Sequence, residues 1–342
     1  MKNRLLRRPG LRWTRWLLLL LCLTLGTAAA AFPSALSATG SRVSVMQTVL
    51  QNDLPVLEIK ASPAAGTLQA FVQDTLSRLA SDPPFGAWKD AEPVYYPLGP
   101  GTHSWLVNVM QDKQRIGYLI ISATDTGGYM LSEYGAGTSG LPYSLTDLRQ
   151  YLVQEGIIHS SYSGKVTLTA LYAPLLPLWK ISLDGKTVYL NAAVPEILPW
   201  SAGKAERILQ GVPAGIHHTV TSSGPPFSPV PVCRSGGTDD PGADLLWLTS
   251  PRLGAASLDN PASLLLPQRS LAFQAAGQND TVGGPFMITG YQLWQPDPGQ
   301  GQITGRPSVY AASGPDGRRF LPFLLLVEKG TLHQLPDTHY ID

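Results

Sequence analysis

Residues 178–192, LWKISLDGKTVYLNA, contain the clearest structural pattern in this chain. Apolar and polar side chains alternate before Asp184-Gly185, and they alternate again after it. An Asp-Gly pair between two alternating runs is typical of a tight turn that joins antiparallel strands. The sequence therefore predicts a β-hairpin with strands over 178–183 and 187–192.

A helix precedes this hairpin. Ser144 stands three residues before Asp147, a spacing typical of a capped helix start, and Gly156 follows the apolar stripe as a stop signal. A further alternating strand is expected over 166–170. Together these features predict a helix followed by an antiparallel three-stranded meander.

The same order of elements is expected earlier in the chain. Residues 67–80 predict a helix, because its apolar residues recur at offsets of three and four: Leu68, Phe71, Val72, Leu76 and Leu79. Strands are expected over 105–109, 116–123 and 128–134. Helix plus meander is thus predicted twice, and each helix is expected to pack on one face of its sheet.

The remainder of the chain is richer in turns. Residues 222–231, SSGPPFSPVP, have the composition of a linker. Beyond them we expect strands over 285–294 and 307–312, a helix over 263–276, and an apolar strand over 319–328 that Pro322 interrupts. A β-rich C-terminal domain is therefore predicted.

The predicted fold class is α+β: two helix-plus-antiparallel-meander units followed by a β-rich C-terminal domain. The predicted segments are a signal peptide or N-terminal anchor over 1–38, a linker over 39–66, the first unit over 67–136, the second unit over 137–199, a linker over 200–224 and the C-terminal domain over 225–342.

The first 38 residues have the order of a secretory signal. A basic start is followed by the apolar run from Trp16 to Leu25, and then by small residues that include Ala28, Ala30 and Ala38. The alternative is an uncleaved membrane anchor, since 16–32 is near the shortest length that spans a bilayer. Both interpretations place the body outside the cytoplasm, either secreted or on the extracytoplasmic face of the cell envelope.

Composition and charge exclude several classes of protein. Only 14% of the 342 residues are charged, and 34 glycines and 30 prolines argue against a coiled coil or a long helical bundle. Six of the 25 basic residues and none of the 24 acidic ones lie before residue 39, so the rest of the chain has a formal net charge of −5. A mildly acidic body is not expected to bind nucleic acid.

Cys233 is the one cysteine outside the predicted signal, because Cys22 lies within it. An internal disulfide is then impossible, which suits a bacterial envelope protein better than an animal secreted one. Cys233 is also the only candidate for a cysteine nucleophile, but it lies among prolines and glycines and the sequence places no histidine beside it.

Two stretches resemble segments of exported bacterial proteins. Residues 117–123, GYLIISA, leading to 129–135, YMLSEYG, resemble the propeptide of streptopain-like cysteine peptidases. Residues 177–183, PLWKISL, followed by 185–192, GKTVYLNA, are similar to the PepSY hairpin, with Asn191 where that family has aspartate. Both resemblances imply a cystatin-like fold, which is one helix on a curved antiparallel sheet.

A third resemblance lies in residues 283–291, GGPFMITGY, which are similar to the strand that carries the catalytic histidine in secreted papain-like peptidases. That histidine is absent here, and Gly284, Pro285 or Phe286 stands in its place. The resemblance therefore implies a degenerate peptidase domain.

Other candidate sites are less specific. His217, His218, His333 and His339 are possible metal ligands, but they lack a recognised ligand spacing, and Asp239, Asp240 and Asp244 suggest either calcium binding or a polar turn. Several aromatic residues suit either a carbohydrate or peptide groove or the core: Trp88, Tyr95, Tyr96, Trp105, Trp247 and Trp294. We expect no catalytic residue beyond the candidate Cys233, no cofactor and no metal.

Three functions follow from these patterns. The first is an exported non-catalytic protein that binds a peptide or a peptidase through cystatin-like units. The second is a secreted cysteine peptidase, or its inactive relic, with Cys233 as nucleophile. The third is a structural or adhesion module of the cell envelope. Contact with a membrane is expected only through residues 1–38, if they are retained.

Overall fold

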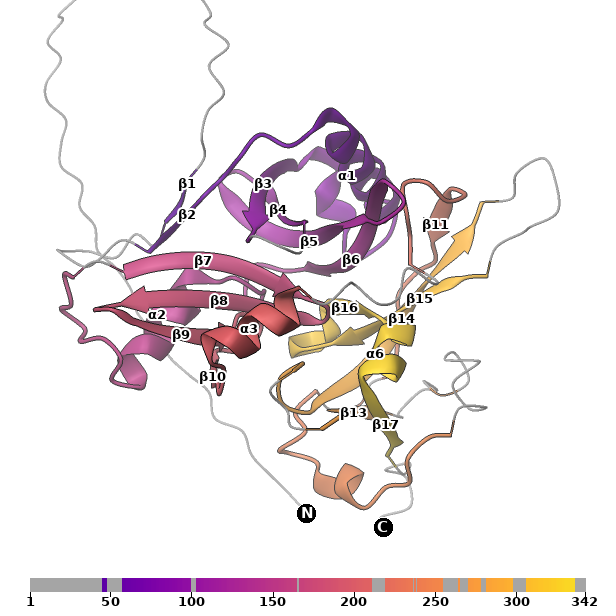
Figure 1. Ribbon diagram of the computed structural model, residues 1–342. Coiled ribbons are helices and arrows are strands. Elements are labelled where there is room, and N and C mark those ends of the chain that lie inside the picture. The colour runs from indigo at the N-terminus through magenta and orange to yellow at the C-terminus, as the bar shows by residue number, and fades with distance from the viewer. Residues whose placement is uncertain are drawn as a thin grey trace, which may run out of the picture. The chain divides into compact units, whose positions relative to one another are not determined.

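The computed structural model of the chain (Figure 1) describes these residues: 45–47, 57–99, 103–164, 166–210, 219–235, 237, 239–254, 264, 270–277, 281–297 and 306–335. The predicted signal peptide or anchor over 1–38 lies outside the described residues.

Helix α1 and an antiparallel meander form the first unit. Its elements are α1 (Gly66–Leu79), the short helix η1 (Gly86–Asp90), β3 (Glu92–Leu98), β4 (Ser104–Gln111), β5 (Gln114–Thr124) and β6 (Gly128–Ala136). Leu68, Val72 and Leu76 on α1 join Val107 and Leu119 in one buried cluster. The helix predicted over 67–80 is therefore confirmed, with its apolar stripe against the sheet. A small two-stranded sheet, β1 (Val45–Gln47) and β2 (Glu58–Lys60), precedes this unit in the chain.

Strand β3 was not predicted from the sequence. It contains Pro93 and Pro97, which interrupt the pattern of a strand. β3 pairs only with β4 in the order of the sheet, so it is an edge strand, where a residue without an N–H is tolerated. The meander of the first unit thus has four strands rather than three.

The second unit is α2 (Leu145–Gln154) followed by β7 (Val166–Ala173), β8 (Leu176–Leu183), β9 (Lys186–Asn191) and β10 (Glu196–Leu198). The predicted hairpin is confirmed: β8 and β9 pair antiparallel, and Asp184 and Gly185 have φ values of 48° and 78°. Positive φ at both turn residues is the geometry that matches the twist of paired strands. The predicted cap is also present, because the Asp147 N–H donates to Ser144 Oγ at 3.2 Å.

The two units share a core. Tyr118 and Ile120 on the face of β5 that points away from α1 lie in one buried cluster with Leu148 of α2 and with Trp179 and Leu190 of the second sheet. The first meander is therefore covered on both faces, by α1 on one side and by the second unit on the other (Figure 1). The opposite face of the second sheet packs against α3 (Ala202–Leu209).

The C-terminal segment continues the first sheet. Its elements are β11 (Phe227–Pro229), β12 (Cys233–Arg234), η2 (Leu245–Leu248), β13 (Leu271–Ala275), β14 (Phe286–Pro296), β15 (Ser308–Ser313), η3 (Pro315–Gly317), β16 (Arg319–Pro322), α6 (Phe323–Lys329) and β17 (Gly330–Gln334). Because β16 pairs with β6, one sheet of eleven strands crosses the predicted boundary at residue 225. The described chain is a mixed α+β fold with a β-rich body.

Two expected elements of this segment are wrong. The strand predicted over 319–328 ends at Pro322, and Phe323–Lys329 form helix α6, which buries Phe323 and Leu326. A short apolar run does not distinguish a strand from a buried helix. The helix predicted over 263–276 is wrong at Leu271–Ala275, which form strand β13 with β14 and β17 as partners on both sides. Leu264 is helical, and 263 and 265–269 lie outside the described residues.

A buried ion pair lies where the three parts of the chain meet. Glu133 on β6 is fully buried, and Arg319 on β16 contacts both of its carboxylate oxygens at 2.8 and 3.0 Å. Tyr118 donates to the same carboxylate at 2.6 Å, and Arg319 also donates to the carbonyl of Leu175 in the second unit. The two opposite charges thus compensate each other where both side chains are largely buried.

Buried tyrosines predict unfolding in alkali. Burial raises the pKa of five phenols above the usual value near 10: Tyr118, Tyr134, Tyr143, Tyr172 and Tyr310. Their neutral form stabilises the fold fully below pH 10. Above that pH the unfolded tyrosines ionise first, and each then lowers stability by up to about 1.4 kcal/mol per pH unit.

Absorbance at 295 nm and far-UV circular dichroism from pH 8 to 12 measure this effect. We expect part of the phenolate absorbance to appear only as the dichroism is lost. Complete ionisation of all tyrosines with unchanged dichroism would contradict the prediction.

Candidate functional site

A cleft of about 770 Å³ lies between helix α1, the turn from β5 to β6 and the segment 219–227. Helix α1 contributes one wall, Gly127 and Tyr129 contribute another, and the side chain of Trp294 from β14 reaches its lining. The cleft therefore combines residues that are more than 200 positions apart in the chain.

Helix α1 has two faces with different roles. Thr67, Phe71, Asp74 and Arg78 recur at offsets of three and four, so they lie along one side of the helix and line the cleft. The apolar stripe that packs on the sheet lies beside it, and Phe71 belongs to both. The same helix thus anchors the unit and presents a mixed polar and aromatic surface.

An aromatic pair is part of the lining of the cleft. The rings of Phe71 and Tyr129 are stacked, with centroids 6.5 Å apart and planes at 19°. The Tyr129 hydroxyl lies 3.5 Å from Thr67 Oγ1. Hydroxyl side chains also line the cleft: Thr67, Thr75, Thr124, Thr221, Ser222 and Ser223. Such a lining provides apolar contact and groups that both donate and accept hydrogen bonds.

Backbone hydrogen bonds hold the segment 219–222 along the edge of β6. The Leu131 N–H donates to the Val220 carbonyl at 2.9 Å, and the Ser222 N–H donates to the Tyr129 carbonyl at 2.8 Å. Ser222 Oγ accepts from the Tyr129 N–H, also at 2.8 Å. These bonds occupy the part of the β6 edge that β16 leaves open.

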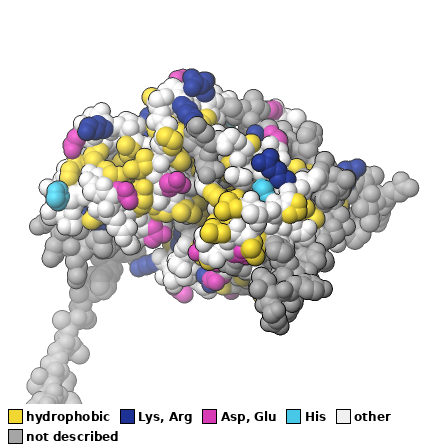
Figure 2. Space-filling view, turned by 90° about the horizontal axis from the view of Figure 1, so that it is seen from below, with side chains coloured by type: hydrophobic (Ala, Val, Ile, Leu, Met, Phe, Trp, Pro, Cys, Tyr) yellow, Lys and Arg dark blue, Asp and Glu magenta, His cyan; other side chains and the backbone are white. Residues whose placement is uncertain are grey.

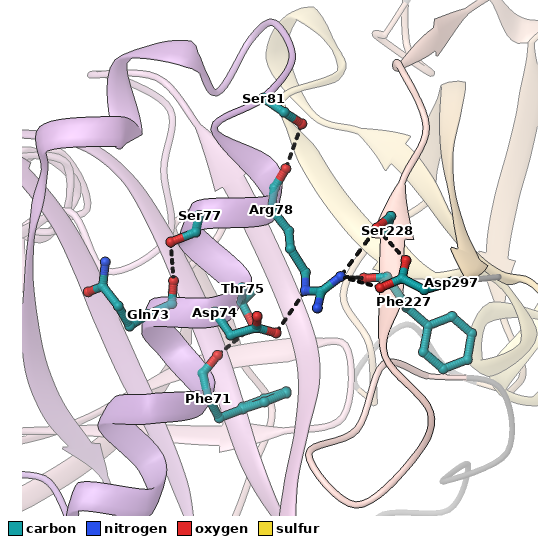
Figure 3. Close-up of polar contacts among 10 residues, drawn as sticks. All are labelled: Phe71, Gln73, Asp74, Thr75, Ser77, Arg78, Ser81, Phe227, Ser228 and Asp297. Carbon is teal, nitrogen blue, oxygen red and sulfur yellow. Dashed lines mark hydrogen bonds and ion pairs between the residues drawn. The ribbon is translucent and has the colours of Figure 1, made fainter. Parts of the chain in front are cut away.

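Arg78 holds the C-terminal end of the segment 219–227, at Phe227 (Figure 3). Its Nη1 donates to the Phe227 carbonyl at 3.0 Å and to Asp297 Oδ2 at 2.8 Å, while Nε donates to Asp74 Oδ2 at 2.8 Å. The nearby carboxylates hold the pKa of Arg78 above its usual value, with the hydrogen bond to Asp74 as the main cause. Hydrogen bonds from Ser228 and then Arg78 lower the pKa of Asp297.

Cys233, the candidate nucleophile, does not line the cleft. It begins strand β12, opposite Tyr291 on β14, and is half-buried. Burial and a hydrogen bond with the thiol raise the pKa of Tyr291. Cys233 is on a strand rather than at a helix N-terminus, and the residue opposite it, Tyr291, has a phenol that its raised pKa keeps neutral. The positions where the papain-like resemblance would have a histidine lie at the start of β14: Gly284 and Pro285 precede the strand, and Phe286 begins it.

The other sequence candidates have local structural roles. His333 Nδ1 lies 3.0 Å from the Ser250 carbonyl, and its ring packs edge-on against Trp247. Asp240 accepts from the Gly242 N–H and Asp244 from the Leu246 N–H, as side chains in polar turns do. His217, His218 and His339 lie outside the described residues. Within the described ranges, no group of three or more metal-ligating side chains converges.

Most of the aromatic candidates are core residues. Trp88, Tyr96 and Trp247 are buried, and Tyr95 and Trp105 pack against the first core cluster. Trp294 reaches the cleft, but its Nε1 is committed to the Tyr134 hydroxyl at 3.0 Å.

Sequence reasoning missed the residues that shape the cleft. Asp74 and Arg78 are four residues apart on a predicted helix, which is a recognisable local ion pair. Nothing local indicates that Arg78 also pairs with Asp297, 219 residues away. In the sequence, Tyr129 belongs to a strand pattern and to the propeptide-like segment 129–135, and neither indicates a cleft.

Exposed apolar side chains occur away from the cleft as well. On the face seen in Figure 2, hydrophobic side chains reach the surface among acidic and basic ones. The large exposed apolar residues of the described chain are Val194, Ile197, Leu245, Leu246, Leu248 and Leu324. Three of them, Leu245, Leu246 and Leu248, lie together on the short helix η2.

No protein-family model, curated protein or solved structure matches this chain. None of the helices in the described part of the chain combines the length and the apolar character that crossing a membrane requires.

Proposed function

We propose that this protein is an exported, non-catalytic binding protein that holds an extended peptide, or an extended segment of a peptidase, in the cleft beside α1. The observation that carries the proposal is the cleft itself, about 770 Å³ in volume and lined by a stacked aromatic pair and by hydroxyl groups. This volume is within the range of ligand-binding pockets.

The proposal includes a cystatin-like character for both units. In each, one helix is followed in the chain by an antiparallel meander, α1 by β3 to β6 and α2 by β7 to β10. The resemblance of residues 117–135 to a peptidase propeptide, and of 177–192 to PepSY, supports the same interpretation. Cystatin-like units of these families are exported, which agrees with the signal-like order of residues 1–38.

An extended peptide suits the chemistry of the cleft better than a compact ligand does. A peptide backbone presents alternating donors and acceptors, and hydroxyl side chains such as those of Thr67, Thr124 and Ser223 satisfy either kind. The rings of Phe71 and Tyr129 offer a surface for one apolar stem. The environment of Cys233, outside the cleft and paired with Tyr291, supports a role without catalysis.

Replacing Tyr129 with alanine is expected to weaken peptide binding about tenfold, because truncating a central aromatic contact costs on the order of 1–2 kcal/mol. The probe is fluorescein-labelled, reduced and carboxymethylated casein, an unfolded chain that offers many extended segments. Fluorescence anisotropy measures its affinity for residues 39–342.

Tyr162→Ala is the matched control, since Tyr162 is a half-buried tyrosine bonded to Asp184 and lies outside the cleft. Cys233→Ser is expected to bind casein as the unaltered protein does. Failure of the unaltered protein to bind the probe would refute the proposal. Casein cleavage that disappears in Cys233→Ser would establish the peptidase alternative instead.

A further inference from the structure

We infer that the cleft selects a peptide with a basic side chain and places its cation beside the carboxylate of Asp74, against the Phe71–Tyr129 aromatic pair. This inference rests on the proposed function, because it names the class of peptide that the same cleft binds. The evidence for it is the ion-pair cluster of Asp74, Arg78 and Asp297, in which the side chain of Asp74 is the most exposed to solvent.

The charged side chains among the described residues that line the cleft are Asp74 and Arg78. Arg78 is shared, since it bonds to Asp74 on one side and, on the other, to Asp297, which does not line the cleft. The cluster of these three side chains has one more carboxylate than guanidinium, and a cationic ligand beside Asp74 would complete its charge balance.

The negative charge is also the one that faces water. The side chain of Asp74 is 58% exposed, whereas those of Arg78 and Asp297 are 25% and 29% exposed. Arg78 turns from α1 toward Phe227 and Asp297, as Figure 3 shows, so its guanidinium is committed to holding the segment in place. An entering ligand therefore meets the carboxylate rather than the guanidinium.

Phe71, the member of the aromatic pair that lies on α1, is next to this carboxylate on the helix surface. Phe71 lies three residues before Asp74, so the two side chains are neighbours on the cleft side of α1. Phe71 stacks on Tyr129. A lysine or arginine presents a long aliphatic stem that packs on aromatic rings and a cation that ring faces attract. Asp74 and the partly exposed Tyr129 both line the cleft, and their carboxylate and ring match the two parts of such a side chain.

Three fluorescein-labelled octapeptides test the inference. They contain serine and leucine around one central residue, which is lysine, norleucine or glutamate. We expect the lysine peptide to bind about five times more tightly than the norleucine peptide, from one exposed ion pair and one cation–aromatic contact, and the glutamate peptide to bind most weakly. In Asp74→Asn the lysine and norleucine peptides should bind with affinities within about twofold of each other.

Two further variants separate charge recognition from damage to the cleft. Asp74→Glu restores the carboxylate and should recover the preference for lysine. Glu155→Gln removes an exposed carboxylate at the end of α2 and should keep the full preference. Unchanged affinity for the norleucine peptide shows that Asp74→Asn has kept the cleft intact.

Equal binding of the lysine and norleucine peptides to the unaltered protein, or a preference for lysine that persists in Asp74→Asn, would overturn the inference and leave the proposed function standing. Absence of binding of the lysine peptide at about 1 mM would also overturn it. The proposed function fails only if labelled casein does not bind either.

Discussion

Replacing Arg319 with methionine is expected to lower the free energy of unfolding by about 3–5 kcal/mol. The substitution leaves the Glu133 carboxylate, which is fully buried, without its bidentate partner. Burial opposes the charge on Arg319, but the Glu133 carboxylate outweighs it, so the pKa of Arg319 lies above its usual value. Urea denaturation followed by tryptophan fluorescence and circular dichroism measures the loss.

The neighbouring arginine provides a matched control. Arg318 is 41% exposed, and its partner Asp316 is 71% exposed. Arg318→Met should therefore change stability by less than about 1 kcal/mol. The double variant Glu133→Gln with Arg319→Met removes the stranded charge and should be more stable than Arg319→Met alone. Equal losses for the Arg318 and Arg319 variants would contradict the assigned role of the pair.

The second large effect is expected from Trp179→Ala, with a loss of about 3–5 kcal/mol. Trp179 is 1% exposed and lies in the cluster that joins the second sheet to the first meander. Its ring meets that of Tyr143 edge-on, with centroids 5.2 Å apart, and the Tyr143 hydroxyl donates to the Leu171 carbonyl at 2.6 Å. Removing the indole leaves a cavity in the cluster that the two units share.

Two comparisons test the reason for that loss. Trp179→Phe keeps an aromatic ring at the site and should cost less than the alanine variant. Trp105→Ala truncates a tryptophan that is only partly buried beside the first cluster, so it should also cost less. If Trp179→Ala were as mild as Trp105→Ala, the second unit would not depend on this contact.

The prediction for Arg319 concerns the support of the cleft rather than its lining. Glu133 is on β6, whose first residues carry Tyr129 into the cleft, and Arg319 holds β16 along the same strand. Loss of either partner is therefore expected to weaken peptide binding indirectly, through stability. Measuring affinity below the unfolding transition distinguishes this effect from direct loss of a contact.

Local signals in the sequence predicted most of the elements that later pack together. The apolar stripe of α1 was visible as a period of three and four, and all five of its residues are buried. Asp184-Gly185 predicted the turn because both residues tolerate positive φ. Strand β3 was hidden by its prolines, and α6 by an apolar run that suits either conformation.

The sequence by itself determined helices α1 and α2 and the hairpin at Asp184-Gly185, because each follows from residues that are close in the chain. The tertiary structure alone decided that β16 extends the sheet from β6 and that Arg78 joins Asp74 to Asp297. These contacts form only when helices and strands from distant parts of the chain pack against one another with complementary side chains and strand edges. Complementarity between residues about 200 positions apart leaves no periodic trace in the sequence, so the cleft and its charge became visible only in the folded chain.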